Sequence, residues 1–381
     1  MDKTSKLKNT ADNILGGFTG AMLTGAYAIC FCTVTGLGLF NAFFCVVICA
    51  LLSLSVKGKI FSPDAFLLIP FIYASSPDLF PFIIIISAVV FFVLKKAVKP
   101  DALPHSVFAG VGLGLALAVT VLVTNVYFGI GADGTTPLEM LSSYRSHGFH
   151  PHFHGLLYGT VTLFAMITYP FKFKKLNKYL PAEFVTLLIP LILNLFLNPD
   201  KSLTVINEAD FLSRPPLVHS FIGGFSDISV SDITSLIEGG FALGVILFLF
   251  SEKDKRESNM LAVSNLASGS LCTVPVKAFD IRAFSVLSAI VMIAVSTLVV
   301  YFFPDYIDRI PAHSIGALLI VSAWQHTPFS AIAKTFKSKS IFEIIATVII
   351  AASFIICDIF SAVIIALAFA VILREVKKNE R

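Results

Sequence analysis

Charged residues are scarce in this sequence. Of its 381 residues, Asp, Glu, Lys and Arg make up only 14%, whereas 56% are hydrophobic and the mean hydropathy is +0.86. Soluble domains carry roughly 25% charged residues, and no long hydrophilic stretch is left here that could form a separate soluble domain. The composition therefore excludes a water-soluble particle. The net charge of +4 is small and indicates no binding to nucleic acid.

Signatures of catalysis and metal binding are also missing. No P-loop, Gly-rich nucleotide fingerprint or Ser/His/Asp arrangement stands in a suitable context, so we expect no enzymatic activity and no cofactor. The six cysteines lie in apolar segments, where Cys is usually a small hydrophobe. Four histidines between His147 and His154 have a density that can bind zinc or nickel. A solvated outer-loop cluster, with weak pH sensing as an alternative, is favoured, and no metal is expected.

Apolar runs recur along the whole chain. Because a helix needs about 20 apolar residues to cross the bilayer core, we expect an all-α polytopic membrane protein with about 14 transmembrane segments. Three segments, 62–75, 258–271 and 275–287, are too short to cross alone and are interpreted as half-helices or interfacial pieces. The full set is 13–34, 36–56, 62–75, 79–95, 104–128, 153–171, 180–197, 232–250, 258–271, 275–287, 287–303, 311–325, 341–356 and 358–373.

Basic residues mark one side of the membrane. If the segments alternate, every Lys/Arg-rich cluster falls on the same side, which is typical of cytoplasmic loops. Both termini are therefore predicted to be cytoplasmic, and the minimal loops suggest the plasma (bacterial inner) membrane. The clusters are Lys3/Lys6/Lys8, Lys57/Lys59, Lys95/Lys96/Lys99, Lys172/Lys174/Lys175/Lys178, Lys253/Lys255/Arg256, Lys334/Lys337/Lys339 and Arg374/Lys377/Lys378/Arg381.

The two halves of the chain echo one another. A proline opens a short apolar segment at Pro63 and again at Pro275, and Gly-Gly-Phe occurs at 16–18 and at 239–241. Short, interrupted spans at matching positions of two halves indicate a transporter with its binding site near the membrane midplane. We therefore predict a single transmembrane domain over 1–381, without a soluble domain. It is an inverted 7+7 repeat, with repeat one over approximately 13–200 and repeat two over approximately 228–375.

Five ionisable residues stand out inside predicted spans, where a charge is costly and marks a functional site by default. They are Asp64, Glu238, Lys277, Asp280 and Arg282. Structural roles are the alternatives. Glu238 would pair with Lys277 or Arg282 and hold two helices together, and the two glycines after it would admit another backbone. Asp64 and Asp280 would be helix N-caps, or Lys277 would pair with Asp280 three residues on.

Several short segments match motifs of one transporter family. Residues 259–269, followed by Pro275 and Arg282, are similar to the stretch that joins its helices 8, 9 and 10, with the spacing from Asn265 to Arg282 kept. Residues 310–312 and 317–324 are similar to its helix 12. Ala-Tyr-Ala at 26–28 and Ser-Pro-Asp-Ala at 62–65 are similar to its helix 1 and to the start of its helix 3. The chain thus resembles the sulfate permease (SulP) family over most of its length, most specifically in 257–325.

The resemblance implies a fold with a core and a gate domain and a substrate site between the starts of helices 3 and 10. It assigns coupling to Glu238, to which we add Lys277 as a charged residue inside a predicted span. Ala242 is apolar where sodium-coupled members offer a hydroxyl, which favours protons over sodium. The substrate-binding residues implied by position are Thr24, Tyr27, Asp64, Ala65, Ala278, Phe279, Asp280 and Arg282.

The chain also departs from the family pattern. The family's usual C-terminal STAS domain is missing from it, and the interval from Arg282 to Ile310 is shorter than the family's. Asp64 and Asp280 replace small or hydroxyl residues at the two helix starts, and would themselves occupy the positive helix ends. Two carboxylates close together would favour protonation of one. The site is therefore expected to be protonated when it binds an anion, or to take another solute.

Three functions are candidates. The first is proton-coupled secondary transport of a small anion of the sulfate, bicarbonate or dicarboxylate class, by alternating access. The second is transport of a nucleobase-like or a cationic or zwitterionic solute on the same fold. The third is a non-transporting membrane sensor or scaffold. The expected partners are the substrate, protons, the lipid bilayer and a second copy of the chain in a homodimer.

Overall fold

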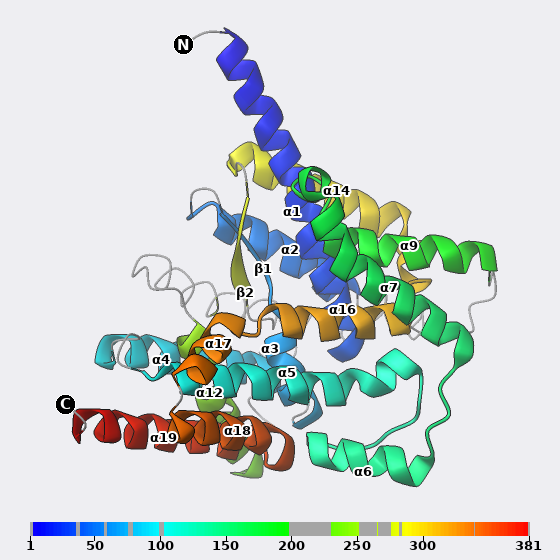
Figure 1. Ribbon diagram of the computed structural model, residues 1–381. Coiled ribbons are helices and arrows are strands. Elements are labelled where there is room, and N and C mark those ends of the chain that lie inside the picture. The colour runs from blue at the N-terminus through cyan, green and yellow to red at the C-terminus, as the bar shows by residue number, and fades with distance from the viewer. Residues whose placement is uncertain are drawn as a thin grey trace.

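The computed structural model is mainly helical. It describes residues 3–35, 39–56, 59–74, 79–98, 103–197, 230–250, 265, 276–281, 284–338 and 340–379. Two short strands, β1 (Lys59–Pro63) and β2 (Val276–Asp280), lie among the helices (Figure 1). The helices are α1 (Lys3–Thr35), α2 (Leu39–Ser53), α3 (Ala65–Ala74), α4 (Phe80–Ala97), α5 (His105–Phe128), α6 (Pro137–His147), α7 (Phe153–Lys172), α8 (Lys174–Asn177), α9 (Ala182–Leu197), α12 (Val230–Phe250), α14 (Val286–Phe302), α15 (Pro304–Asp308), α16 (Ala312–Gln325), α17 (Phe329–Lys337), α18 (Ile341–Ile356) and α19 (Ile359–Asn379).

Helices long and apolar enough to cross a membrane occur along the described part of the chain. Five qualify alone, within α1, α4, α5, α12 and α19. A sixth candidate is formed by α16 and α17 together, which are bent by 44° at their junction, and α2, α9, α14 and α18 are shorter apolar helices. These helices support a multi-pass membrane protein. The count of fourteen spans and the inverted repeat remain predictions, and segment 258–271 lies outside the described residues apart from Asn265.

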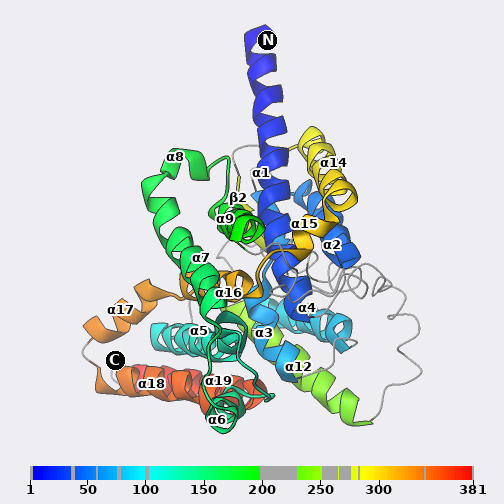
Figure 2. The ribbon, with the colours of Figure 1, turned by 90° about the vertical axis from the view of Figure 1, so that its right-hand side faces the viewer.

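The helices pack side by side around a shared apolar core. α5 contacts α16, α17 and α18, and α16 contacts α7, which in turn contacts α9. Another set is formed by α1, α2 and α14. Figures 1 and 2 show α1 descending from the N-terminal end into the middle of the molecule, where it lies beside β1 and α9. This helix therefore lies between the strand pair and the helices α9 and α16.

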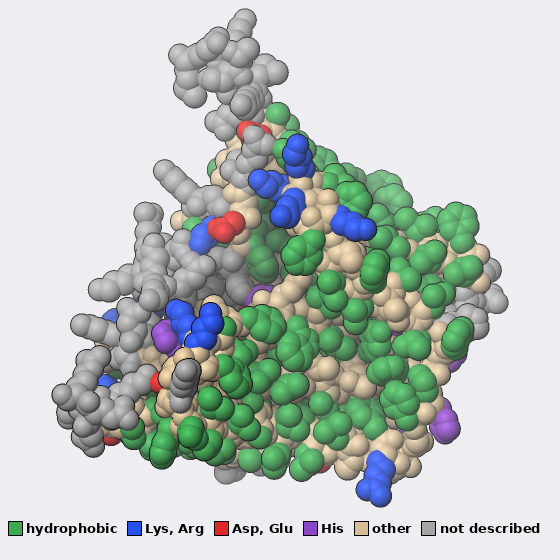
Figure 3. Space-filling view, in the orientation of Figure 1, with side chains coloured by type: hydrophobic (Ala, Val, Ile, Leu, Met, Phe, Trp, Pro, Cys, Tyr) green, Lys and Arg blue, Asp and Glu red, His purple; other side chains and the backbone are tan. Residues whose placement is uncertain are grey.

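Large hydrophobic side chains cover much of the surface. Phe171 and Phe196 expose 73% and 83% of their areas, and Figure 3 shows hydrophobic side chains over most of the described face. A contiguous apolar surface of this extent marks contact with membrane or with another protein. The basic side chains in view gather in small groups, near the end of α7 and beside α17, as the lysine clusters of the sequence suggest.

Glycines bring α12 and α4 into close contact. A Cβ on Gly240 would lie 2.5 Å from Cβ of Ile86, and one on Gly244 would lie 2.8 Å from the carbonyl oxygen of Ser87. At both positions a side chain would collide with α4. The prediction that the glycines after Glu238 admit another backbone is therefore confirmed, and the neighbour is α4.

The two strands join opposite halves of the chain. They are antiparallel, and Lys59 pairs with Asp280, Ile60 with Phe279 and Pro63 with Val276. The predicted helix over 275–287 is therefore wrong at 276–280, since a helix begins only at Val286. Val276 and Phe279 have side chains that favour a β-strand. The backbone of this segment pairs with β1, whereas a helix of so few residues would be unstable, because nucleating a helix is costly.

Besides the short helices α8 and α15, two longer helices stand where the sequence predicts loops. α6 lies in the predicted outer loop and begins with a capping box, in which Thr136 and Glu139 exchange hydrogen bonds between side chain and backbone, after which Pro137 opens the helix. α17 follows α16 and carries Lys334 and Lys337 in its last turn. Both helices are too polar for the apolar-run search that located the spans.

Candidate functional site

The candidate site lies where β1 ends and α3 begins. A Cβ on Gly20 of α1 would lie 2.5 Å from Cδ1 of Ile60, so this side chain faces α1. Alternate side chains of a strand share a face, which puts Ser62 on the same side. Helix and strand run in the same direction in Figure 1. Thr24 lies about 6 Å beyond Gly20 along α1, and Ser62 lies about 7 Å beyond Ile60, so these two residues are level.

Two hydroxyl groups at this level lack a hydrogen-bond partner among the described residues. They are Oγ1 of Thr24 and Oγ of Ser62, and both side chains are fully buried. A buried polar group left unpaired costs about 1–3 kcal/mol, and such groups in native proteins call for an explanation. Both hydroxyls are free to donate to an anion or to another polar solute.

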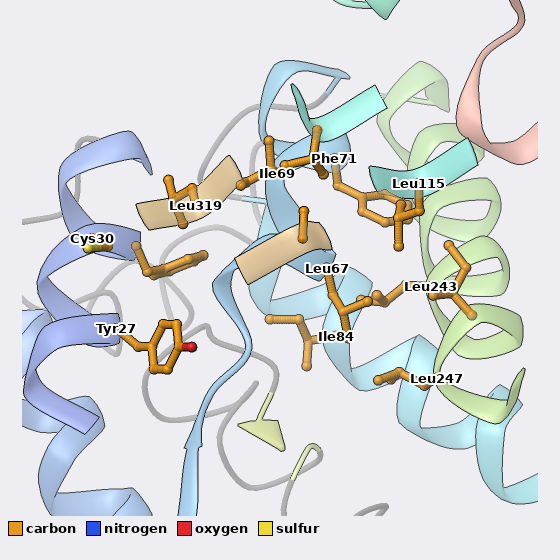
Figure 4. Packing of buried hydrophobic residues seen from close by; sticks show 14 of the residues in the cluster. Tyr27, Cys30, Leu67, Ile69, Phe71, Ile84, Leu115, Leu243, Leu247 and Leu319 are labelled. Atoms are coloured by element: carbon orange, nitrogen blue, oxygen red, sulfur yellow. The ribbon is translucent and has the colours of Figure 1, made fainter. Parts of the chain in front are cut away.

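Tyr27 lies one turn further along α1 and is buried. Its ring stacks on Phe279 of β2, with 5.9 Å between the ring centroids. Its hydroxyl lies 3.5 Å from Oε1 of Glu183 on α9 and 3.4 Å from Oγ of Ser322 on α16. Figure 4 shows the Tyr27 ring reaching from α1 toward β1. Both oxygen–oxygen distances are long compared with the usual value of about 2.7–2.8 Å, so the hydroxyl is committed to neither acceptor.

The two aspartates of the predicted site are far apart. Asp64 follows β1 in the N-cap position of α3, its carbonyl oxygen accepts from the N–H of Leu67, and its side chain is buried. It acts electrostatically on Tyr27. The Asp280 side chain is 91% exposed, with its carboxylate 3.8 Å from Nζ of Lys59.

Asp280 is therefore neither a helix N-cap nor a neighbour of Asp64. The register puts it at the opposite end of the strand pair, about 13 Å along the strand from the β1–α3 junction. The expectation of two adjacent carboxylates is wrong because β2 is extended. The predicted pairing of Lys277 with Asp280 requires both residues to lie on one helix. Because they lie on β2, this prediction is also wrong.

Of the other predicted substrate residues, some lie near Tyr27 or the two strands, and others fall outside the described part of the chain. Phe279 contacts Tyr27, and Ala65 is the first residue of α3. Ala278 and Lys277 pair in register with residues 61 and 62 of β1, which brings the Lys277 backbone to the level of the two hydroxyls. Arg282 and Pro275 lie outside the described residues.

Glu238 lies apart from Thr24, Ser62, Tyr27 and Asp64. It lines a cavity of about 270 Å³ together with Asp358 at the start of α19. The other walls come from the C-terminal half of α3, the start of α6 and the junction of α18 with α19. Neither Tyr27 nor Asp64 is among the lining residues, so the structure does not bring the predicted coupling residue to the β1–α3 junction.

The histidine run lies between the end of α6 and the start of α7. Nε2 of His147 lies 3.6 Å from Oδ2 of the exposed Asp133, and the ring of His152 lies 6.4 Å from the buried ring of His313 on α16. In the described part of the chain, no three His, Cys, Asp or Glu side chains are placed to hold a metal ion.

Three residues of the candidate site, Ser62, Ser322 and Glu183, are missing from the site predicted from the sequence. Ser62 stands within the motif at 62–65 and Ser322 within the one at 317–324, but neither motif singles out its serine. Glu183 begins a predicted span, where an acidic residue is typical of an ordinary first helical turn. The apolar residues on both sides, Pro181-Ala182 and Phe184-Val185, are the sequence signal that distinguishes it from an ordinary exposed carboxylate.

Comparison with known proteins rests on structure. No family model matches the sequence, and no curated protein matches it. Among solved structures, the transmembrane domain of the cyanobacterial bicarbonate transporter BicA matches with a TM-score of 0.65 and 14% identity, over 94% of this chain and 97% of that one. SLC26A9 matches with a TM-score of 0.74 and 14% identity, over 97% of this chain and 66% of that one. This chain has the fold of a SulP/SLC26 transmembrane domain.

A third solved structure agrees. Murine Slc26a9, an anion transporter in the inward-facing state, matches with a TM-score of 0.70 and 14% identity, over 96% of this chain and 68% of that one. The chain therefore spans the whole of the BicA domain but about two thirds of the SLC26A9 chains. The SulP-like fold expected from the motifs is thereby confirmed. At this identity the likeness establishes the fold and leaves the solute to the residues of the site.

Proposed function

We propose that this protein is a secondary active transporter of a small anion, which binds between α1, the end of β1 and the start of α3. The observation that carries the proposal is the pair of buried hydroxyls, Thr24 and Ser62, that have no partner among the described residues. The first N–H groups of a helix and its positive dipole end favour an anion in the same place. The structural neighbours named as bicarbonate and anion transporters support the same class.

Asp64 makes a proton part of this proposal. Its carboxylate would share the start of α3 with the anion, and two unit charges about 5 Å apart repel by about 3 kcal/mol at an effective dielectric constant of about 20. The anion therefore binds more tightly when Asp64 is protonated, and lower pH raises the affinity. Sulfate, bicarbonate and dicarboxylates are the substrate class.

Glu238 retains its proposed coupling role at a distance from the anion. Its cavity supports a path by which protons reach the transport domain, and the apolar, buried Ala242 one turn on offers no ligand for sodium. Lys277, level with Ser62 by its backbone, is the proposed accompanying charge. Loss of proton-driven uptake in Glu238→Gln supports this role, and unchanged coupling removes it.

The finer architecture belongs to the same proposal. It comprises fourteen spans in two inverted repeats of seven, over approximately 13–200 and 228–375, divided into core and gate domains. The antiparallel pairing of β1 with β2 is the arrangement that a two-fold axis in the membrane plane would produce. Both termini lie in the cytoplasm of a bacterial cell, and the protein forms a dimer.

The first test is a thermal-shift panel on detergent-purified protein at two pH values. A ligand that binds only the folded state stabilises it by RT ln(1 + [L]/Kd). Sulfate, bicarbonate and fumarate are compared with uracil and simple amines. We expect an oxyanion to stabilise the protein, more so at the lower pH, and to be taken up into liposomes.

Variants that lack one of the two hydroxyl groups test where the anion binds. Hydrogen bonds to charged groups contribute about 1.5–3 kcal/mol, so Thr24→Val and Ser62→Ala should each weaken anion binding roughly tenfold to a hundredfold. Thr335→Val and Ser353→Ala are the matched controls, because these buried hydroxyls already donate to carbonyls of their own helices. Unchanged affinity in both test variants would contradict the proposed site.

A ring-shaped neutral or cationic solute is the second candidate. It is favoured by the Tyr27–Phe279 stack and by the carboxyl groups of Asp64 and Glu183 around it. Stabilisation by uracil or an amine, and by no oxyanion, would establish this reading over the first. Folded protein that moves no solute in liposomes would instead support a sensor or scaffold.

A further inference from the structure

Glu183 is a carboxyl group next to the site that the proposed function does not use. It stands in the first turn of α9, partly buried, within the sequence Pro-Ala-Glu-Phe-Val. No lysine or arginine of the described residues forms an ion pair with it. Apolar surroundings disfavour its charged form, whereas the start of a helix favours it. Because these two effects oppose each other, neither the charged nor the neutral form of Glu183 is strongly favoured. This carboxyl group is therefore suited to exchange a proton during transport.

Tyr27 has a single hydroxyl proton to donate. Its oxygen lies between Oε1 of Glu183 at 3.5 Å and Oγ of Ser322 at 3.4 Å. A carboxylate is a stronger acceptor than a serine hydroxyl, so ionised Glu183 attracts this proton. Protonated Glu183 accepts less well, which leaves the Tyr27 hydroxyl available to an anion beside Thr24 and Ser62.

The contact joins two sets of helices. Tyr27 belongs to α1, which packs against β1, α2 and α14, whereas Glu183 and Ser322 belong to α9 and α16, which pack against each other and against α7. Alternating access requires two such sets to move relative to each other. The Tyr27 contact is therefore one that transport has to form and break.

We propose that Glu183 is a second proton-binding group of the anion site, and that its carboxylate and the anion compete for the Tyr27 hydroxyl. The inference rests on the proposed anion transport. It makes binding of the anion dependent on protons at two places, Asp64 on the α3 side and Glu183 on the α9 side. Because a charged Glu183 both repels the anion and holds Tyr27, anion affinity rises as pH falls.

Other titratable groups surround this contact, and the test has to separate them. The hydroxyl of Tyr169 donates to the carbonyl oxygen of Leu180, and Nδ1 of His326 lies 2.7 Å from the carbonyl oxygen of Ser322. Of these, only His326 ordinarily titrates near neutral pH. The titratable groups on the elements packed here include Tyr27 and Cys30 on α1, Asp64 after β1, Tyr158, Tyr169 and Lys172 on α7, His313 on α16 and His326 after it.

The test uses Trp324, the single tryptophan of the chain, which lies two residues after Ser322. Sulfate binding to the purified full-length protein is measured by this fluorescence from pH 5 to pH 8, where the charge of sulfate is constant. A group that must bind one proton makes Kd change about tenfold per pH unit above its pKa. Glu183→Gln should bind sulfate more tightly at pH 8, and its pH dependence should be weaker by up to that factor. Tyr27→Phe should reduce the difference between Glu and Gln at position 183 to the part that charge repulsion alone produces.

Controls keep the test decisive. Glu343→Gln alters another buried carboxyl in the first turn of an apolar helix, bonded to Ser338 instead of Tyr27, and should behave as the wild type. His326→Gln removes the competing titration, and Glu183→Asp should retain the pH dependence if the Gln variant folds poorly. Sulfate affinity in Glu183→Gln with the wild-type pH dependence would overturn the inference while leaving the transport proposal intact.

A second readout works without any ligand. The Trp324 fluorescence of the ligand-free protein should titrate in His326→Gln, and should not do so when Glu183→Gln is combined with that substitution. If no oxyanion binds at any pH but this titration is present, the anion proposal fails and the Glu183–Tyr27 contact stands. If the titration persists in the variant that combines His326→Gln with Glu183→Gln, the assignment of the proton to Glu183 is wrong.

Discussion

Substitution by alanine should affect the stability of the protein differently at two glycines of α12, Gly239 and Gly244. A Cβ on Gly239 would lie 3.3 Å from Cδ1 of Ile83, the flexible end of a side chain, whereas one on Gly244 would lie 2.8 Å from the backbone oxygen of Ser87. Alanine is favoured over glycine in a helix by about 1 kcal/mol, and this term is common to both variants. The collision at Gly244 adds an overpacking cost of about 1–3 kcal/mol.

We therefore expect Gly239→Ala to be as stable as the wild type or slightly more stable. Gly244→Ala should unfold at a free energy about 1–3 kcal/mol lower than Gly239→Ala. Unfolding by sodium dodecyl sulfate, followed by size-exclusion chromatography of a fluorescent fusion, measures the difference. Because the helix-propensity term cancels between the variants, the comparison isolates the contact with α4. Equal stability of the two variants would refute the close approach of α12 and α4.

Two further predictions concern the strand pair and the membrane topology. Asp280→Asn should change the free energy of unfolding by less than about 1 kcal/mol, because exposed ion pairs contribute little and this carboxylate is 3.8 Å from Lys59; a larger loss in a denaturation assay would restore Asp280 to the site. A green fluorescent protein fused to the C-terminus should fluoresce, and alkaline phosphatase inserted within α6 should be active, because α6 is predicted to lie outside. The reverse pattern would invert the topology.

The sequence predicts the apolar helices well because each is dictated by its own residues. α5, α7 and α16 begin and end within about two residues of the predicted spans, since hydrophobic length and flanking turns are local properties. α6 and α17 were missed because capping and amphipathicity, which also produce helices, leave no apolar run. The close approach of α12 to another helix was predictable from its glycines, although α4 as the partner was not.

The candidate site was harder to predict because it depends on pairing between distant segments. Residues 276–280 are short enough to be helix or strand, and only the hydrogen bonds from β1 decide between them. That choice moves Asp280 from the expected site to the surface. Glu183 and Ser322 join the site through Tyr27, a contact between α1, α9 and α16 that no local pattern encodes.

The strand pair also constrains how the protein is made. β1 emerges from the ribosome long before β2, its only strand partner among the described residues, and unpaired backbone groups are not tolerated in the hydrocarbon core of a membrane. During synthesis β1 and α3 must therefore wait in a hydrated place, such as an insertion channel or the membrane surface, until the second half arrives. The candidate site therefore cannot be completed before β2 has been synthesised, and a chain that ends before Val276 cannot form it.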